Sequence, residues 1–208
     1  MTEVIPAILE KDFSEIEKKI HLVENLVSWV QIDIADGQLV PNTTFLDPVP
    51  FKNLKTLIKL ELHMMVKEPA KLVSPFVEVG FSRFFAHVES QGVEDYIAAC
   101  YRHDVEVGLA IDGPTSFEKI HPFLDNLDAV LVMAIEAGFS GRPFREDTVE
   151  KIKKIKDAFF DLPIAVDGAM NAQNAKKVIA AGATRINSNS YIFGSQDIPA
   201  SIQNLAKL

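Results

Sequence analysis

The sequence predicts a single-domain α/β protein, spanning residues 1–208, in which eight parallel strands close into a (β/α)8 barrel, the TIM barrel. Short apolar runs alternate with amphipathic runs about eight times. Neither a linker nor a low-complexity insert interrupts the series, and 208 residues can bury one large core. A doubly wound open sheet is the alternative. It is disfavoured because Leu9, Glu10 and Lys11 stand where a glycine-rich dinucleotide loop would follow the first strand.

The predicted elements follow from hydrophobic spacing. The first strand is expected at 4–9, and the helix after it at 12–25, where Phe13, Ile16 and Ile20 recur along one face. The further strands are expected at 29–36, 59–66, 83–89, 106–112, 129–136, 163–169 and 183–190. Helices fit between them at 70–79, 93–102, 116–123, 148–160 and 171–181, with a last helix from Pro199. Residues 50–58 give no clear pattern.

Composition excludes several classes of function. The net charge of -8 leaves no broad basic face, so no nucleic-acid partner is expected. No apolar run approaches the roughly 20 residues that span a bilayer, and the first residues lack the basic start of a signal peptide; we expect a cytoplasmic protein without a membrane partner. The single cysteine, Cys100, excludes an internal disulfide and a cysteine-based zinc cluster. We also expect a homo-oligomer, but the number of subunits does not follow from the sequence.

The stretch 29–42 carries the most informative residue. In its strand, alternation places Gln31, Asp33 and Ala35 on one face. Asp36 and Gly37 are explained by a turn. An ionised Asp33 on the inner face of a β-branched strand is costly unless a metal, a partner or a chemical role compensates for it. Asp33 is therefore a candidate functional residue.

Chemistry in a barrel of this kind lies where the strands end, and the predicted ends are rich in acids and imidazoles. The side chains at these ends are Asp33, His63, His87, Glu89, Asp112, Glu136, Asp167 and Asn189. None is a lysine, which disfavours a Schiff-base aldolase. His63 alone is equally consistent with a hydrogen-bonded residue of the barrel wall. Together with Asp33 and Asp167 it forms a candidate metal or proton-transfer set.

Several motifs resemble those of the ribulose-phosphate 3-epimerase family. They run over nearly the whole chain in the family's order: IPAIL, IDIADGQLVPN, ELHMMVKEP, FFAHVES, VLVMAIEAGFSGRPF, AVDGAMNAQN and NSYIF. The resemblance implies that Asp33 and Asp167 act as acid and base on opposite sides of a substrate carbon. It also implies a divalent metal (zinc, manganese or iron) held by these aspartates and two histidines, one matching His63.

The resemblance further implies how a sugar phosphate would be held. Removing a proton beside a ketone builds an enediolate, whose charge needs a metal or aimed donors. The loop 137–144 would close over the site. The phosphate would rest on backbone N–H groups, with Ser188 or Arg142 helping, where a short helix at 190–193 follows the last strand. The positions implied in substrate binding are Ala7, Met65, Gly138, Gly141, Gly168, Ala169, Asn189 and Ser190.

The departures from the family pattern gather at the same mouth. Gln31 stands where the family has its other metal-binding histidine, and an amide oxygen is a poor ligand for zinc-like ions. The other changes are Ala7 for a serine, Ala35 for a methionine, Ala137 for a proline, and Ala169 and Asn189 for glycines. We therefore expect an epimerase with a weakened metal site. The alternative is a divergent member that binds a sugar phosphate or another anion without epimerase activity, or that catalyses a different sugar-phosphate reaction.

A related superfamily of decarboxylases and hexulose-phosphate synthases ranks third. It keeps an Asp-x-Lys-x-x-Asp array on a strand. Here Ala35 falls at the lysine and Gln38 at the second aspartate, so the charge that would stabilise its carbanion is missing.

Overall fold

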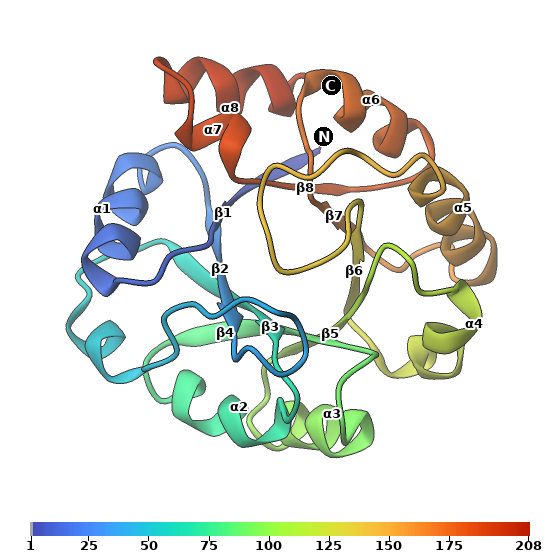
Figure 1. Ribbon diagram of the computed structural model, residues 1–208, viewed down its shortest axis with the longest axis horizontal. Coiled ribbons are helices and arrows are strands. Elements are labelled where there is room, and N and C mark those ends of the chain that lie inside the picture. Colours follow the sequence, from blue (N-terminus) through green and yellow to red (C-terminus); the bar gives the residue numbers. More distant parts are fainter. Residues whose placement is uncertain (1) are drawn as a thin grey trace.

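The computed structural model describes residues 2–208, and its eight strands form the predicted closed barrel (Figure 1). Every neighbouring pair is parallel, and β1 pairs with β8 to complete the ring. The fold is a single-domain TIM barrel. The strands are β1 (Glu3–Ile8), β2 (Trp29–Ala35), β3 (Lys59–Met65), β4 (Phe81–His87), β5 (Glu106–Ile111), β6 (Ala129–Met133), β7 (Ile164–Asp167) and β8 (Arg185–Ser188).

Helices surround the strands and cover their outer faces (Figure 1). They are α1 (Phe13–Val23), η1 (Val49–Asn53), α2 (Ala70–Val77), α3 (Val93–Arg102), α4 (Phe117–Ile120), η2 (His121–Asn126), α5 (Thr148–Ala158), α6 (Ala172–Ala180), α7 (Ser190–Phe193) and α8 (Ile198–Ala206). The short 3-10 helix η1 occupies the first part of the stretch 50–58, which had no clear pattern. None of the helices within residues 2–208 is long and apolar enough to cross a bilayer.

Several predicted elements are wrong in extent: the strands expected at 163–169 and 183–190 cover only 164–167 and 185–188, and two further differences have a clear cause. The single helix expected at 116–123 is a short α-helix followed by the 3-10 helix η2. Pro122 has no N–H to continue the α-helical ladder, so the chain tightens there. The strand expected at 129–136 ends at Met133, because beyond it the chain leaves the sheet toward the loop that precedes α5.

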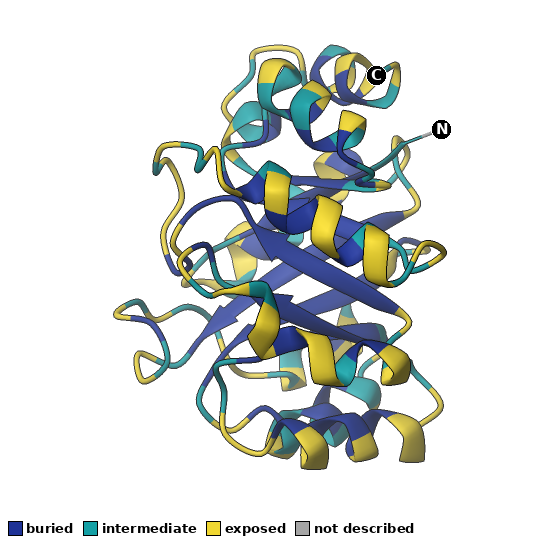
Figure 2. Ribbon diagram, turned by 90° about the vertical axis from the view of Figure 1, so that its right-hand side faces the viewer, coloured by how far each residue is buried: buried dark blue, intermediate teal, exposed yellow. Residues whose placement is uncertain are grey.

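The strands alternate between two environments. Val30, Ile32 and Ile34 belong to the large apolar cluster between strands and helices, whereas Gln31, Asp33 and Ala35 face the barrel interior. Figure 2 shows the result: buried strands lie behind helices whose outer faces are exposed. The period-two prediction for β2 is confirmed.

The barrel interior is divided into an apolar and a polar part. On one side, Phe85, Ala110, Leu131 and Ala165 pack together. Gly108 makes room for the ring of Phe85, because a Cβ at this position would lie 2.3 Å from the ring's Cε1. The other side, built mainly by β2, β3, β4 and β8, carries buried polar and charged side chains. The candidate site lies on this polar side, at the carboxyl-terminal ends of the strands.

Candidate active site

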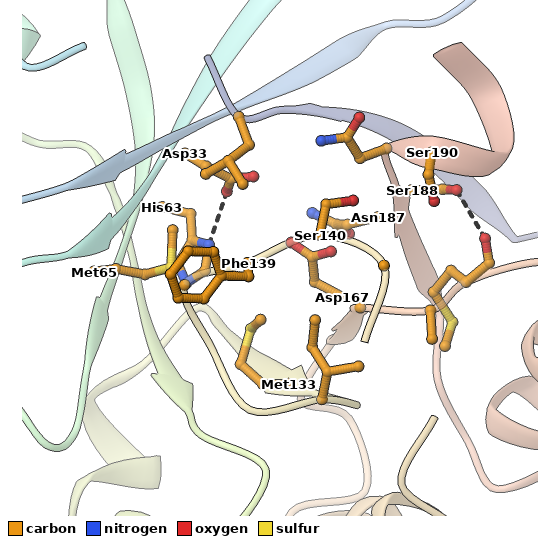
Figure 3. Close-up of a pocket in the computed structure, with 18 residues that line it drawn as sticks. Asp33, His63, Met65, Met133, Phe139, Ser140, Asp167, Asn187, Ser188 and Ser190 are labelled. Carbon is orange, nitrogen blue, oxygen red and sulfur yellow. Dashed lines mark hydrogen bonds and ion pairs between the residues drawn. The ribbon is translucent and has the colours of Figure 1, made fainter. Parts of the chain in front are cut away.

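Asp33 and Asp167 come from the ends of β2 and β7 and meet in one pocket at the carboxyl-terminal mouth of the barrel (Figure 3). Their side chains are largely buried, at 6% and 8% exposure. His63 and Met65, from the end of β3, line the same pocket. Parallel closure therefore unites residues that stand far apart in the sequence.

Gln31 links the two carboxylates directly. Its Nε2 donates to Asp33 Oδ1 at 2.8 Å and to Asp167 Oδ2 at 2.6 Å. Its Oε1 points away and accepts a hydrogen bond from Asn187 Nδ2 at 2.6 Å. Gln31 is fully buried. It lies beside the pocket and presents hydrogen-bond donors, rather than its oxygen, to the aspartates.

Burial changes the protonation of both aspartates. It raises the pKa of Asp33 well above its ordinary value, against a lowering effect of the hydrogen bond from Gln31. Burial, together with the nearby charge of Asp33, raises the pKa of Asp167 to about 7. Two carboxylates this close favour a state in which one keeps a proton while the other is ionised. Such a pair can both donate and accept a proton.

His63 belongs to a buried series of polar contacts. Its Nδ1 lies 2.8 Å from Asp33 Oδ1, and its Nε2 lies 2.9 Å from His87 Nε2. His87 Nδ1 lies 3.1 Å from Glu89 Oε2. Burial, and then the neighbouring His87, lower the pKa of His63 to about 3, so its imidazole is neutral near pH 7. His63 thus orients Asp33 without adding a positive charge.

A lid covers the pocket. The loop between β6 and α5 crosses the mouth of the barrel (Figure 1), and Gly138, Phe139, Ser140 and Gly141 line the pocket from it. Asn42 Nδ2 donates to the carbonyl of Gly138 at 2.7 Å. Gly138 has φ +105°, and a Cβ there would lie 2.9 Å from Val40 Cβ. The lid is therefore docked on the loop that follows β2.

The opposite wall of the pocket is made by the loops after β7 and β8. Gly168, Ala169, Asn189 and Ser190 line it, as the sequence suggested. Ala169 adopts φ +54°, a left-handed conformation that normally favours glycine. Asn174 Nδ2 donates to its carbonyl at 2.8 Å and helps to hold this turn.

Several residues singled out in the sequence lie outside the pocket, and one that lines it has its side chain bonded elsewhere. Glu136 is exposed and pairs with Arg142, so neither reaches the pocket wall. Asp112 Oδ1 accepts from the backbone N–H of Ala137 at 2.8 Å and thereby anchors the base of the lid. Ala7 is fully buried beside Gln31 in the β1–β2 register, below the residues that line the pocket. Ser188 lines the pocket, but its hydroxyl donates to the Met170 carbonyl at 2.9 Å.

A buried polar group, of which Asn187 lines the pocket while Glu61 and Arg83 lie outside it, was not predicted from the sequence. Asn187 Nδ2 donates to Glu61 Oε1 at 2.9 Å, and Arg83 Nη1 donates to Glu61 Oε2 at 2.7 Å. The alternation of inward and outward side chains along the strands could have predicted these residues. Glu61 stands two positions before His63, and Asn187 two before Asn189, so each shares the inward face of a predicted strand-end residue.

Three side chains of the pocket carry ligand atoms that suit a divalent ion. Asp33, His63 and Asp167 each offer one such atom, and these atoms lie within 4.8 Å of one another. Gln31 Nε2, however, bridges the two carboxylates, so a cation held between them would meet amide hydrogens. The residues supply three candidate ligands, but with Gln31 in this orientation they do not fit the ion that the family resemblance implies.

Fold and site define the chain as a TIM barrel with two buried carboxylates in one pocket at its carboxyl-terminal mouth. The sequence profile of the ribulose-phosphate 3 epimerase family matches residues 3–193, and the chain belongs to this family. It is 30% identical to the ribulose-phosphate 3-epimerase of Bacillus subtilis, covering 99% of this chain and 98% of that protein. It is 32% identical to the enzyme of the same name from Chlamydia muridarum, over 94% of this chain and 90% of that one.

Solved structures with low sequence identity share the fold. KGPDC from Streptococcus mutans superposes with a TM-score of 0.77 at 10% identity, covering 100% of this chain and 96% of that one. A 3-hexulose-6-phosphate synthase superposes with a TM-score of 0.75 at 14% identity, covering 100% and 99%. In the present chain Ala35 is buried in the interior and Gln38 is exposed on a loop. The array of charges expected for that superfamily is absent at these two positions.

Proposed function

We propose that this protein epimerises a ketose phosphate by two-base proton transfer, with Asp33 and Asp167 as the acid and base. The observation that carries the proposal is the meeting of these two buried carboxylates in one pocket, from strands that are not neighbours. One carboxylate removes the proton beside the ketone, and the other, as a carboxylic acid, returns a proton to the opposite face. His63 holds Asp33 in place through its 2.8 Å contact.

The pocket walls have separate roles in this proposal. The lid, with Gly138 and Gly141, excludes water from the enediolate. The backbone N–H groups of Gly168, Ala169, Asn189 and Ser190 bind the phosphate, and Met65 forms an apolar side of the sugar site. Ala7 does not line the pocket, and its contribution is to pack beside Gln31 in the β1–β2 register. A divalent metal held by Asp33, His63 and Asp167 would supply Lewis-acid chemistry, but the amide hydrogens of Gln31 between the two carboxylates disfavour such an ion.

Deuterium incorporation tests the acid and base roles. Ribulose 5-phosphate is incubated with the enzyme in deuterated water, and label at carbon 3 is followed together with formation of the other epimer. Asp33→Asn and Asp167→Asn are each expected to slow epimerisation by about 10²- to 10⁴-fold. Each variant keeps one base, so each is expected to retain exchange from only one of the two epimers.

The matched control is Asp161→Asn, which removes an exposed carboxylate outside the pocket. It is expected to behave as the unmodified protein. Equal losses in all three variants, or none in Asp33→Asn and Asp167→Asn, would refute the two-base assignment.

The second candidate function is binding of a sugar phosphate without epimerisation. The hydrogen-bonded bridge that Gln31 forms between the two carboxylates supports this second function, because the site departs here from the ligand set of the family. Calorimetric titration with ribulose 5-phosphate separates the two functions. Saturable binding without any exchange of the carbon-bound proton would support the binding protein and overturn the epimerase.

A further inference from the structure

A series of buried hydrogen bonds runs down the barrel interior from the two aspartates. Gln31 is joined through Asn187 to Glu61, and Glu61 is joined to Arg83. Gln31, Asn187 and Glu61 are fully buried, and Arg83 is 3% exposed. The guanidinium of Arg83 also lies 3.7 Å above the ring of Trp29. The series of hydrogen bonds therefore ends, on the side away from the two aspartates, at the buried positive charge of Arg83.

The number of amide hydrogens determines how the side-chain amides of Gln31 and Asn187 are oriented. Gln31 Nε2 uses its two hydrogens on Asp33 and Asp167, and Asn187 Nδ2 uses its two on Gln31 Oε1 and Glu61 Oε1. Turning Gln31 over would set its oxygen against two carboxylates and its N–H₂ against that of Asn187. Turning Asn187 as well would set its oxygen against Glu61 Oε1. With no proton on the carboxylate oxygens that face Gln31 and Asn187, only the observed arrangement pairs every amide donor with an acceptor.

This arrangement leaves one polar atom without a partner. Asn187 Oδ1 is buried and accepts no hydrogen bond within residues 2–208. An unpaired buried oxygen is unfavourable, yet the two amides keep their orientation. The acceptor oxygens of Glu61 therefore determine how Asn187, and through it Gln31, is turned.

We propose that Gln31 is a fixed hydrogen-bond donor that ties the two carboxylates together in place of a metal ion. Arg83, Glu61 and Asn187 are its positioning residues. The inference rests on the proposed function in one respect, because Asp33 and Asp167 are the acid and base that it holds together. It predicts that the site works without a divalent ion.

Metal affinity tests the positioning role. Calorimetric titration with Mn²⁺ compares the unmodified protein with Glu61→Gln. A glutamine at this position can donate to Asn187 Oδ1, so both amides can turn and Gln31 can offer its oxygen to an ion. Glu61→Gln is expected to bind Mn²⁺ about 10- to 100-fold more tightly, which is the usual size of an effect transmitted to a metal through a ligand's partner.

The control is Glu106→Gln. Glu106 accepts from the same Arg83, at 2.6 Å, and neither of the two amides bonds to it. It is expected to leave Mn²⁺ affinity unchanged. Equal Mn²⁺ affinities of Glu61→Gln and the unmodified protein would overturn the positioning role, as would an equal gain in Glu106→Gln.

A spectroscopic measurement on the unmodified protein does not depend on the folding of any Glu61 variant. In a ¹⁵N-labelled, chelator-treated sample, the side-chain N–H₂ signals of Gln31 are assigned by their loss in Gln31→Met. Both hydrogens are expected to exchange slowly with solvent and to keep their shifts when Zn²⁺ is added. Rapid exchange, or a saturable shift with Zn²⁺, would refute the inference.

These measurements use no substrate, so they separate the two proposals. If ribulose 5-phosphate shows no proton exchange, the epimerase assignment fails while the amide and metal measurements still decide the role of Gln31. If the unmodified protein binds Zn²⁺ with loss of the N–H₂ signals, the inference fails and the exchange assay still stands.

Discussion

Replacing Arg83 with methionine is expected to destabilise the barrel strongly. Arg83 Nη1 bonds to Glu61 Oε2 at 2.7 Å, and the two side chains are 4% and 0% exposed. Methionine fills similar space along the stem but leaves Glu61 as a buried carboxylate without its cation. Removing one partner of a buried ion pair costs about 3–5 kcal/mol. Because Asn187 still donates to Glu61, we expect about 3 kcal/mol, the lower end of that range.

Thermal unfolding measures the effect. For a chain of this length, about 3 kcal/mol corresponds to a fall in Tm of roughly 6–12 °C. Glu106 is the other partner of Arg83, and its side chain is 42% exposed. Glu106→Gln removes only this partly exposed pair and is expected to cost less than about 1 kcal/mol.

The double variant Arg83→Met with Glu61→Gln isolates the buried charge. Glutamine keeps an oxygen for Asn187 but carries no charge, so the double variant is expected to recover most of the Tm lost by Arg83→Met alone. If Arg83→Met and Glu106→Gln lower Tm equally, or if the double variant is less stable than Arg83→Met, the reasoning about the buried charge is wrong.

Four further predictions concern the site and its surroundings. Ala169→Gly relieves a φ of +54° and is expected to stabilise the protein by about 1 kcal/mol, seen as a rise in Tm. Asn42→Ala removes the 2.7 Å bond to the lid backbone and is expected to raise KM for the sugar phosphate about fivefold, measured by steady-state kinetics. Gln31→His adds an imidazole beside three candidate ligands and is expected to raise Zn²⁺ affinity at least about 10-fold by calorimetry. Burial raises the pKa of Glu89, but His87, the Thr115 side chain and the Asp112 backbone N–H together outweigh burial, and the folded pKa is about 2. The free energy of unfolding should therefore fall as pH drops from 4.5 toward 2, and Glu89→Gln should lose this part of the pH dependence.

Controls distinguish these effects from general damage. Ala181→Gly changes a residue at φ -84° and is expected to lower Tm, opposite to Ala169→Gly. Asn25→Ala changes an exposed asparagine far from the lid and should leave KM unchanged. If Ala169→Gly lowers Tm, the left-handed backbone is not a source of strain. An unchanged KM in Asn42→Ala, an unchanged Zn²⁺ affinity in Gln31→His, or an unaltered pH dependence in Glu89→Gln would each contradict its prediction.

Hydrophobic spacing in the sequence was enough to predict the barrel and the inward face of β2. A strand buried on both sides leaves alternate residues for two different environments, and Val30, Ile32 and Ile34 occupy the helix-facing one. Asp33 was therefore identified as an inward carboxylate before any contact was known. The ends of β3 and β7 gave His63 and Asp167 by the same argument, because parallel strands that close a barrel bring their ends to one mouth.

Local sequence could not predict where every element ends, or which role each acidic residue at a strand end has. Asp112 and Glu136 both follow apolar runs, yet one anchors the lid and the other is exposed. The difference depends on where the chain leaves the sheet. That point is determined by contacts with neighbouring strands and loops rather than by the run itself.

The orientation of Gln31 was decided only by the tertiary structure. The sequence identified this residue as an exception to the family's metal ligands and predicted a weaker metal site. It could not show that the amide nitrogen faces the carboxylates, because the partners that turn it lie on other strands: Asp167, 136 residues away, and Asn187, 156 residues away. An amide has a donor end and an acceptor end of almost the same shape, so its polarity depends on the hydrogen bonds that barrel closure brings to it.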